Sequence, residues 1–425
     1  MTEEAADDLL WFVGFDWGSQ NHRASVFNQA GKLVGRRDVT HAAGAYAALC
    51  DGLIETTQAD PSRIGVAIET SHGPVVDMLL DRGFAVFSLN PKQLDRFRDR
   101  YSPAGAKDDT RDADVLGRSL RTDRDAFRRL SPDDPLVVQM REATRLAEEL
   151  TRERVRLTNR FRDQLWRYYP QAMKLADDYG DAWFMALWSL APTPAKGAKL
   201  HKETIARLLK EHRIRRLDVD QVRAILREPA LVVAPGVVEA ASAHIRSLLP
   251  RLRLVNSQLK DVHKTIDGFL AALGEPEETE PGQSPEQRDV TILHSLPGVG
   301  RIVSATLLSE APGAVRRRDY QALRTLTGVA PVTRRSGKTC LVTRRLAHNH
   351  RLARAVHHWA RVAVMHDPTC RARYDGLRRR GHKPARALRG VGDRLLALLC
   401  SLLRQRVLFD PHYKEKQAGA DARMA

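Results

Sequence analysis

The longest regular pattern in this chain is an apolar stripe between residues 245 and 273. Its members follow one another at alternating steps of three and four residues over four heptads; they are Ile245, Leu248, Leu252, Val255, Leu259, Val262, Ile266, Phe269 and Leu273. An α-helix places such residues along one seam, and a seam of this length needs a partner helix to cover it. The pattern therefore predicts a long coiled-coil helix, with a kink or a helix start at Pro250.

A second long helix is predicted from Leu136 to Tyr169. Its apolar residues have a similar spacing, which Arg154 interrupts; they are Met140, Ala143, Ala147, Leu150, Leu157 and Phe161. Two such helices can pair within one chain or between two subunits, and their spacing leaves both arrangements open. Residues 171–235, between them, indicate mixed helix and loop without a recognisable motif.

The first 90 residues have the pattern of an α/β fold. Residues 10–16 (LWFVGFD) predict a strand, and residues 23–28 and 33–39 predict two more, joined by the turn Asn-Gln-Ala-Gly. A helix is predicted from Ala43 to Thr56, and two apolar runs, 64–70 (IGVAIET) and 84–90 (FAVFSLN), are typical of buried strands. Three antiparallel strands, a helix, and then buried strands alternating with helices is the order of the ribonuclease H fold.

Carboxylates occur where this fold brings strand ends together. Asp16 ends the first predicted strand, and Glu69 lies at the end of the fourth. Carboxylates on neighbouring central strands can point at one spot at the edge of the sheet, so these two residues are candidate site residues.

Four more acidic residues are crowded into the stretch 104–118 (AGAKDDTRDADVLGR). If a helix begins near Lys107, Asp109 and Asp112 share one face at i and i+3, while Asp108 and Asp112 would fit at i and i+4. Asp114 falls far round the helix and is expected in solvent. These acids either complement the dipole of a solvated helix N-terminus or belong to a site.

A cluster of four converging carboxylates would be strongly self-repelling without divalent cations. Hard oxygen ligands suit Mg²⁺ or Mn²⁺, and pairs of these ions clamp a phosphodiester that undergoes in-line displacement. The sequence therefore predicts a two-metal site of this kind.

The positive charge of the chain is concentrated in its last quarter. The net charge is +17, yet residues 311–425 hold 26 Lys and Arg against 7 Asp and Glu, a net of +19. The preceding 310 residues have a net charge of −2. A neutral body with a strongly basic end is the electrostatic pattern of a nucleic-acid-binding protein.

No apolar run reaches membrane-spanning length, so no membrane anchor is expected. The N-terminal residues MTEEAADDLL lack the basic region of a signal peptide, and the four cysteines are widely scattered. Both observations favour a reducing cytoplasm over secretion.

Residues 274–287 (GEPEETEPGQSPEQ) have the composition of a linker, and a basic domain is predicted to follow. This domain opens with 292–310 (ILHSLPGVGRIVSATLLSE), which has the pattern of a helix-hairpin-helix, with a plain helical hairpin as the alternative. Gly298 and Gly300 would let backbone amides approach a DNA phosphate, and Arg301 follows them.

The stretch SGKT at 336–339 is not a phosphate-binding P-loop, because the motif would need glycine where Val332 stands. Ser336 is instead predicted in a loop with three cations, Arg334, Arg335 and Lys338. It is either placed to meet a phosphate or is a simple turn residue.

Five motifs occur in the order seen in transposases of the insertion-sequence one-ten family, and the resemblance extends over about residues 10 to 405. They are FVGFDWGSQNHRASVF, IGVAIETSHG, AKDDTRDADVLGR, LHSLPGVGRIVSATLLSE and LTGVAPVTRRSGK. The resemblance implies a RuvC-like domain with an Asp-Glu-Asp-Asp tetrad, a coiled coil, and a C-terminal domain with a nucleophilic serine.

The family pattern Lys-x-Asp-x-x-Asp-Ala falls on Lys107, Asp109, Asp112 and Ala113, which selects Asp109 over Asp108. The first Asp and the Glu of the tetrad fall on Asp16 and Glu69. The serine, which follows a Gly-x-x-Pro turn at Gly328 and Pro331, falls on Ser336. Many relatives have a second glycine after this serine, where the present chain has Lys338.

The resemblance also implies partners. A recombinase of this kind excises and inserts its own element, and a bridge RNA encoded by the element pairs with donor and target double-stranded DNA, so that base pairing selects the sequence. Family members assemble into homodimers and homotetramers through their coiled coils, and a RuvC-like site of one subunit meets the serine domain of another. The protein would act at the bacterial nucleoid.

The expected architecture is α/β plus α. It comprises a RuvC-like domain at 8–130, a coiled-coil region at 134–273 with the insertion 171–235, the linker 274–287, a serine transposase domain at 288–405 and a tail at 406–425. Two other classes stay open. One is a RuvC-like nuclease or Holliday-junction resolvase that uses activated water, and the other is a non-enzymatic nucleic-acid-binding protein.

Overall fold

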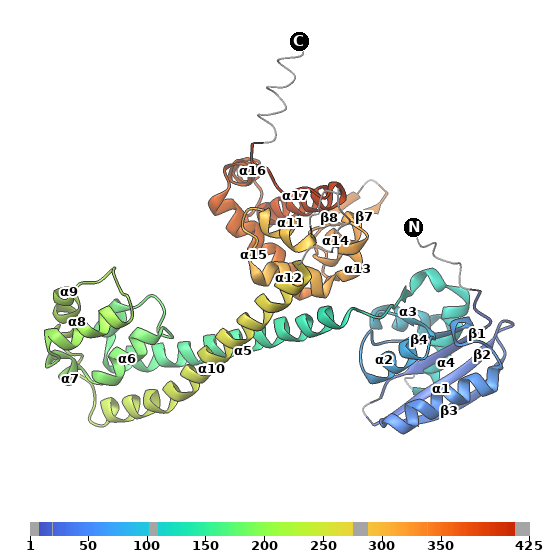
Figure 1. The fold of residues 1–425 in the computed structure, drawn as a ribbon, viewed down its shortest axis with the longest axis horizontal. Helices are drawn as coiled ribbons and strands as arrows, with labels where there is room; N and C mark the ends of the chain where they lie inside the picture. The colour runs from blue at the N-terminus through green and yellow to red at the C-terminus, as the bar shows by residue number, and fades with distance from the viewer. Residues whose placement is uncertain (1–7, 19, 102–108, 275–287, 338, 413–425) are drawn as a thin grey trace, which may run out of the picture. The chain divides into compact units, whose positions relative to one another are not determined.

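The computed structural model describes residues 8–18, 20–101, 109–274, 288–337 and 339–412. The chain divides into two units, Met1–Asp133 and Asp134–Ala425. The first unit contains a mixed sheet with helices on both faces, and the second is mainly helical (Figure 1). Among the described helices, none has the length and apolar character needed to cross a membrane.

The first unit is built on a six-stranded sheet with the order β3-β2-β1-β4-β5-β6. The strands are β1 (Trp11–Asp16), β2 (Asn21–Asn28), β3 (Leu33–Thr40), β4 (Ile64–Ile68), β5 (Ala85–Ser88) and β6 (Arg128–Arg129). The first three are antiparallel, β1, β4 and β5 are parallel, and β6 runs antiparallel to β5. This mixed sheet is consistent with the RuvC-like domain expected from the sequence, although the two-residue β6 was not predicted.

Helices cover the two faces of this sheet. The helices are α1 (Ala43–Thr57), α2 (Pro74–Asp81), α3 (Pro91–Tyr101) and α4 (Asp109–Thr122). Side chains alternate along β1: Val13 and Phe15 pack with α1 and α2, whereas Phe12 packs with α3 and α4. The sheet is therefore buried on both sides, which explains the continuous apolar runs of β4 and β5.

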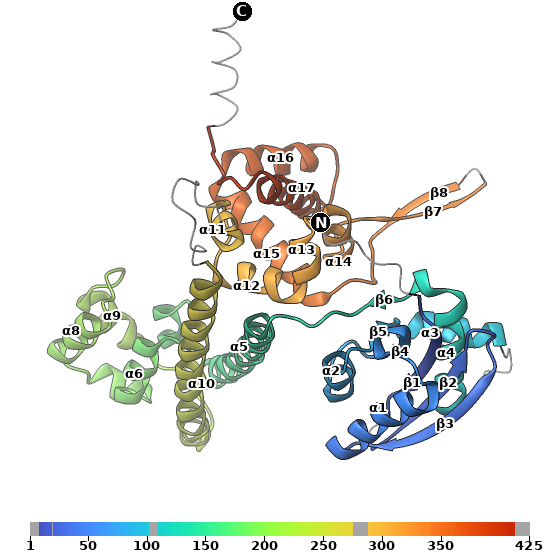
Figure 2. The ribbon, with the colours of Figure 1, turned by 45° about the vertical axis from the view of Figure 1, so that its right-hand side comes forward.

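The second unit contains two long helices that lie side by side, α5 (Pro135–Tyr168) and α10 (Val237–Gly274) (Figures 1 and 2). The predicted stripe on α10 is buried from Ile245 to Ile266, and it faces the apolar residues of α5 within the same chain. The helix does not begin at Pro250, because it continues through this residue from Val237.

A polar layer crosses this helix pair at the position where Arg154 interrupts the apolar stripe. Arg154 donates from Nε to Oδ1 of Asn256 on α10 (2.8 Å) and from Nη2 to Oδ2 of Asp178 (2.7 Å). Asn256 donates in turn to the carbonyl oxygen of Gly180 (2.8 Å). These bonds anchor the segment that follows α5 and fix the register of the pair.

Residues 170–226 form a small helical lobe against one end of this pair (Figure 1). It contains the 3-10 helix Pro170–Leu175, α6 (Ala182–Leu190), α7 (Pro194–Ala198), α8 (Lys202–Glu211) and α9 (Val219–Leu226). Phe161 of α5 packs on Phe184 and Trp188 of α6, so the lobe shares its core with α5 and α10.

The C-terminal helices enclose a separate core around the fully buried Trp359. They are α11 (Asp289–Ser295), α12 (Arg301–Glu310), α13 (Pro312–Arg316), α14 (Tyr320–Leu326), α15 (His350–His366), α16 (Pro368–Arg379) and α17 (Pro384–Gln405). A two-stranded hairpin, β7 (Val332–Ser336) and β8 (Thr339–Thr343), extends away from them (Figure 2). Most of the predicted linker and the end of the predicted tail lie outside the described residues.

An ion-pair network joins these helices to α5. Glu310, whose side chain is 7% exposed, accepts hydrogen bonds from Arg145 Nε (3.2 Å) and Asn349 Nδ2 (3.0 Å). Arg351 of α15 pairs with Glu148 of α5 at 2.9 Å. Buried and shared carboxylates of this kind make the attachment specific and sensitive to the loss of either partner.

Candidate active site

Asp16 and Glu69 lie at the same edge of the sheet of the first unit. Asp16 is the last residue of β1 and is 8% exposed. Phe15 pairs with Ile68 in the parallel register of β1 and β4, so Asp16 and Glu69 occupy the next positions on neighbouring strands. The prediction that these two acids share a strand-end edge is consistent with this register.

Asp16 also belongs to the face of the sheet that α4 covers. Phe12 on β1 and Ala67 on β4 lie in the core beside α4, and every second residue of a strand faces the same way. Asp16 is four positions after Phe12, so the alternation places it on the α4 side. Glu69 directly follows the last residue of β4 and lies in a bend.

Helix α4 lies directly on β1, because glycine replaces a side chain at the contact. An ideal Cβ on Gly14 would lie 1.8 Å from the carbonyl oxygen of Ala113 and 2.4 Å from the amide nitrogen of Gly117. Farther along α4, Leu120 lies against Gly65, the β4 residue paired with Phe12. The helix thus runs antiparallel to β1, and its N-terminus lies toward the edge that carries Asp16.

Asp112 lies in the first turn of α4, one residue before the closest contact with β1. Its side chain is 3% exposed and pairs with Arg98 of α3, at 2.6 Å from Nε to Oδ1 and 3.3 Å from Nη2 to Oδ2. Asp109 is the first residue of α4, one turn before Asp112, as the i and i+3 spacing requires. Lys107 and Asp108 lie outside the described residues.

Asp114 does not extend into solvent as expected. It forms an ion pair with Arg36 of β3, at 2.6 Å from Nη2 to Oδ2, and its side chain is 19% exposed. The neighbouring strand supplies a partner that the sequence pattern of α4 alone does not reveal.

The donor set at this edge has the chemistry that divalent cations prefer. Asp16, Glu69 and Asp112 offer hard carboxylate oxygens, and Arg98 already sets a positive charge against Asp112. Among the residues that the structure describes, no three acidic, histidine or cysteine side chains are gathered at metal-binding distance. The edge therefore fits a metal by the type of its ligands.

A histidine–tyrosine chain that the sequence analysis missed holds the segment after β1. The Gly18 amide donates to Nδ1 of His22 (3.1 Å), so Nε2 of His22 carries the proton and donates to Tyr46 Oη (2.9 Å). The Tyr46 hydroxyl then donates to Nδ1 of His41 (2.7 Å). Trp17 stacks on His22 with ring centroids 4.5 Å apart. Burial, and secondarily the charge of His41, lowers the pKa of His22.

Ser336 is the last residue of β7 rather than a residue of an irregular loop. It pairs with Thr339 at the tip of the hairpin, and Gly337 makes the turn with φ +52°. The side chains of Ser336, Arg334 and Arg335 are exposed. Lys338 lies outside the described residues.

The predicted helix-hairpin-helix segment consists of α11, a turn at 296–300, and α12. Gly298 has φ +78°, and a Cβ there would lie 2.7 Å from the amide nitrogen of Ala363 on α15. Gly300 is exposed with open space around it, and it precedes Arg301, which pairs with Asp267 of α10 at 2.8 Å. The glycine at 298 thus serves the packing of α15, whereas the backbone at 300 is accessible.

A strand-end group of acids on a sheet of this order, in a chain with a strongly basic C-terminal region, is typical of enzymes that cut polynucleotides. Residues 13–170 match the family model of the DEDD domain of IS110 elements, described as "Transposase". Residues 290–375 match the model described as "Transposase IS116/IS110/IS902 family".

Curated relatives carry the same assignment. "Mini-circle putative transposase for IS117" of Streptomyces coelicolor is 32% identical over 415 residues, which cover 95% of this chain and 96% of that protein. "Putative transposase y4uE" of Sinorhizobium fredii is 48% identical over 217 residues, which cover 51% of this chain and 60% of that protein. The chain belongs to the IS110 family of insertion-sequence transposases, enzymes that cut and rejoin DNA.

Proposed function

We propose that this protein is the recombinase of an insertion sequence and that it uses a serine nucleophile and a metal-binding tetrad. The observation that supports this most directly is the edge of β1 and β4, where Asp16 and Glu69 follow paired residues and the N-terminus of α4 lies toward the same edge. The second unit contributes an exposed serine at the tip of a cationic hairpin. Acids and serine are the two groups that such a reaction needs.

Asp16, Glu69, Asp109 and Asp112 are the proposed ligands of Mg²⁺ or Mn²⁺. When bound, the ions supply positive charge to the phosphoryl and leaving oxygens of a phosphodiester. Arg98 acts on the same carboxylate group as a fixed cation, because its guanidinium remains beside Asp112. It limits the repulsion among the acids before a metal arrives.

Ser336 is the proposed nucleophile. Its Oγ forms a bond to the phosphorus of the scissile phosphodiester, and the bond from phosphorus to one deoxyribose oxygen breaks. A base takes up the proton of the serine hydroxyl, and the leaving deoxyribose oxygen is protonated. Arg334, Arg335 and Lys338 stabilise the charge on the non-bridging oxygens. A hydroxyl of the new strand then attacks the phosphoserine and restores Ser336. The bond energy is conserved, as rejoining requires.

The partners follow from the same proposal. Donor and target double-stranded DNA and a bridge RNA bind the basic domain of 288–405, with the Gly300 backbone and Arg301 among the contacts, and base pairing with the RNA selects the sites. The exposed parts of the α5 and α10 pair join subunits into dimers and tetramers. The protein works on the bacterial nucleoid within the cytoplasm.

The test is a search for a protein–DNA adduct. A stalled reaction with metal is digested with protease, and the nucleotide-bearing peptide is mapped. Wild-type protein should yield an adduct on Ser336, and Ser336→Ala should bind DNA yet give no adduct and no recombinant. Thr339→Ala is the matched control, because it removes a hydroxyl from the residue paired with Ser336. Recombination by Ser336→Ala at the wild-type rate would disprove the serine mechanism.

The second candidate is a metal-dependent nuclease or junction resolvase that uses activated water. It is favoured by the fold of the first unit, which carries all its acids without needing the hairpin. Under this alternative Ser336→Ala cuts DNA normally, and no adduct forms at any stage.

A further inference from the structure

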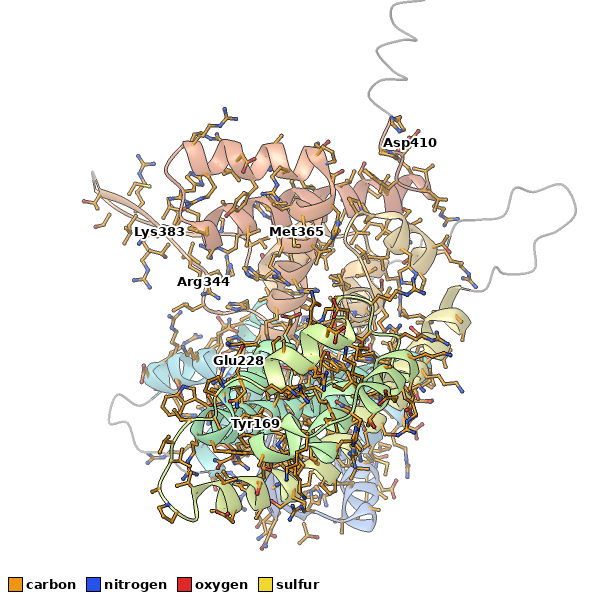
Figure 3. All side chains as sticks on the ribbon, turned by 90° about the vertical axis from the view of Figure 1, so that its left-hand side faces the viewer. Tyr169, Glu228, Arg344, Met365, Lys383 and Asp410 are labelled. Carbon is orange, nitrogen blue, oxygen red and sulfur yellow. The ribbon has the colours of Figure 1, made fainter. Side chains whose placement is uncertain are left out.

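The structure contains a group of cations that neither the predicted tetrad nor the hairpin tip accounts for. It lies where α15 and α17 cross, next to the base of the hairpin. Figure 3 draws two cations of this region, Arg344 and Lys383, on the same side of the second unit. The members of the group, named here the crossing cluster, are Arg344, His357, Arg361, Arg386 and Arg389.

The packing of the two helices brings these residues together. Gly392 of α17 has no side chain, and a Cβ there would lie 2.9 Å from Val356 and 3.8 Å from Ala360 of α15. Arg389 lies one helical turn before Gly392, while His357 and Arg361 follow directly after the two α15 residues. The close contact thus sets cations of both helices around one point.

Arg344 joins the cluster from the hairpin. It follows Thr343, the last residue of β8, which pairs with Val332 at the base of the hairpin. The charges of Arg344 and Arg386 add to burial in lowering the pKa of Arg389. The pKa of His357 is likewise lowered, by burial first and then by the charges of Arg361, Arg389 and Arg344. These groups therefore lie close enough to repel one another.

No acid compensates this repulsion within the described part of the chain. No ion pair is formed there by the four arginines of the cluster, whereas Arg351 and Arg354 of α15 each pair with a carboxylate. Arg351, for example, pairs with Glu148. Neighbouring cations without a carboxylate are a binding site for an anion that carries several negative oxygens.

The position of the cluster relative to Ser336 indicates which anion. Ser336 at the tip of the hairpin lies four positions after Val332 at its base, a span of about 13 Å at 3.3 Å per residue. Phosphates of one duplex strand follow one another every 3.4 Å along the axis, so this span corresponds to about four phosphates. A DNA strand attacked at the tip can thus reach the hairpin base.

We propose that the crossing cluster binds the phosphodiester backbone of the DNA duplex that Ser336 attacks, about four phosphates from the scissile bond. This site rests on the proposed function for the identity of the DNA. Its binding chemistry is independent of the serine reaction, because phosphate contact requires only the cations.

The experiment measures binding of the full-length protein to a fluorescent 20-base-pair DNA duplex of arbitrary sequence, with EDTA present, at several salt concentrations. Arg344→Gln and Arg389→Gln should each weaken binding and lower the slope of log K against log salt by about 0.9, the value for one lost phosphate contact. Arg207→Gln, which removes the same charge from an exposed position on α8, should leave the slope unchanged. An RNA duplex of the same sequence is measured in parallel, so that a site used by RNA alone can be recognised.

Unchanged DNA slopes for both variants would overturn the proposal, and so would a loss confined to the RNA duplex. Arg344→Gln lies outside the helix crossing, so it tests the site even if Arg389→Gln alters the fold. Arg389→Lys should keep most of the slope, since it retains the charge. Because these binding measurements contain no free metal and form no adduct, failure of the serine mechanism would leave their outcome unaffected.

Discussion

The contact between α4 and β1 predicts that one methyl group can disable the acidic site. In Gly14→Ala the new Cβ would lie 1.8 Å from the carbonyl oxygen of Ala113, whereas a carbon–oxygen contact needs roughly 3 Å or more. The atom it meets is backbone, so no side-chain rotation relieves the overlap. Helix α4 has to retreat by about 1.2 Å, and its first turn carries Asp109 and Asp112 with it.

The expected cost is larger in activity than in stability. Overpacking of this kind destabilises a protein by about 1–3 kcal/mol, while a misplacement of about 1 Å in a catalytic group lowers the rate about 100-fold. Recombination between donor and target plasmids measures the rate, and thermal unfolding of the purified protein measures the stability. We expect Gly14→Ala to fold with a lowered melting temperature and to recombine at about 1% of the wild-type rate.

Substitutions at two further glycines serve as comparisons for Gly14→Ala. Gly117→Ala on the facing helix meets Phe27 at 2.8 Å and the Gly14 amide at 2.9 Å, so a smaller retreat and an intermediate loss of activity are expected. Gly35→Ala on β3 has nothing within 4 Å and should behave as wild type. A folded Gly14→Ala protein with wild-type recombination would show that this contact does not position the acids.

Three other predictions concern charge. Arg98→Met removes the cation beside the buried Asp112 carboxylate, so the melting temperature without metal should fall. Added Mn²⁺ should raise the melting temperature of this variant by more than it raises that of the wild type. An equal rise in both proteins would contradict this. The pKa of His22 is lowered in the folded state, so the unfolded state binds the proton more readily. The stability of the protein should therefore decline as the pH falls below about 6.5. His22→Gln should flatten this decline, measured as the urea midpoint of unfolding between about pH 5.5 and 7.5. Glu310→Gln leaves the arginine partners of Glu310 with a neutral acceptor, which should loosen the attachment of α12 and α15 to α5. Amide hydrogen exchange should then be faster in α12, with little change in the first unit.

Sequence patterns were sufficient for the parts of the fold that repeat regularly. The order of strands and the position of Asp16 and Glu69 at strand ends followed from apolar runs and turn residues, because a parallel register then leaves few choices. Seven of the nine residues of the predicted stripe of α10, from Ile245 to Ile266, are buried, whereas Phe269 and Leu273 are only partly buried and Leu270 lies in the core. The partner of α10 was not predicted, since spacing cannot tell a helix of the same chain from one of another.

The missed parts depend on residues far apart in sequence. Arg98 is one of several arginines on α3, and only the approach of α4 distinguishes it. His22, His41 and Tyr46 come from β2, the end of β3 and α1, and no local spacing links them. The hairpin at Ser336 lacked a strand signal because its sequence is mostly polar, and exposed pairing gives no alternation of buried and solvated residues.

The pairing of α5 with α10 also determines the order in which the protein can fold on the ribosome. All elements of the first unit are complete by residue 129, but the apolar face of α5 ends at residue 168 and α10 begins only at Val237. At about 5–20 residues per second, translation leaves that face uncovered for several seconds. The first unit can therefore finish folding while the apolar face of α5 is still covered only by a chaperone or by the lobe of residues 170–226. A ribosome that stalls in this interval would release a chain that cellular proteases reach before any serine-bearing hairpin has been made.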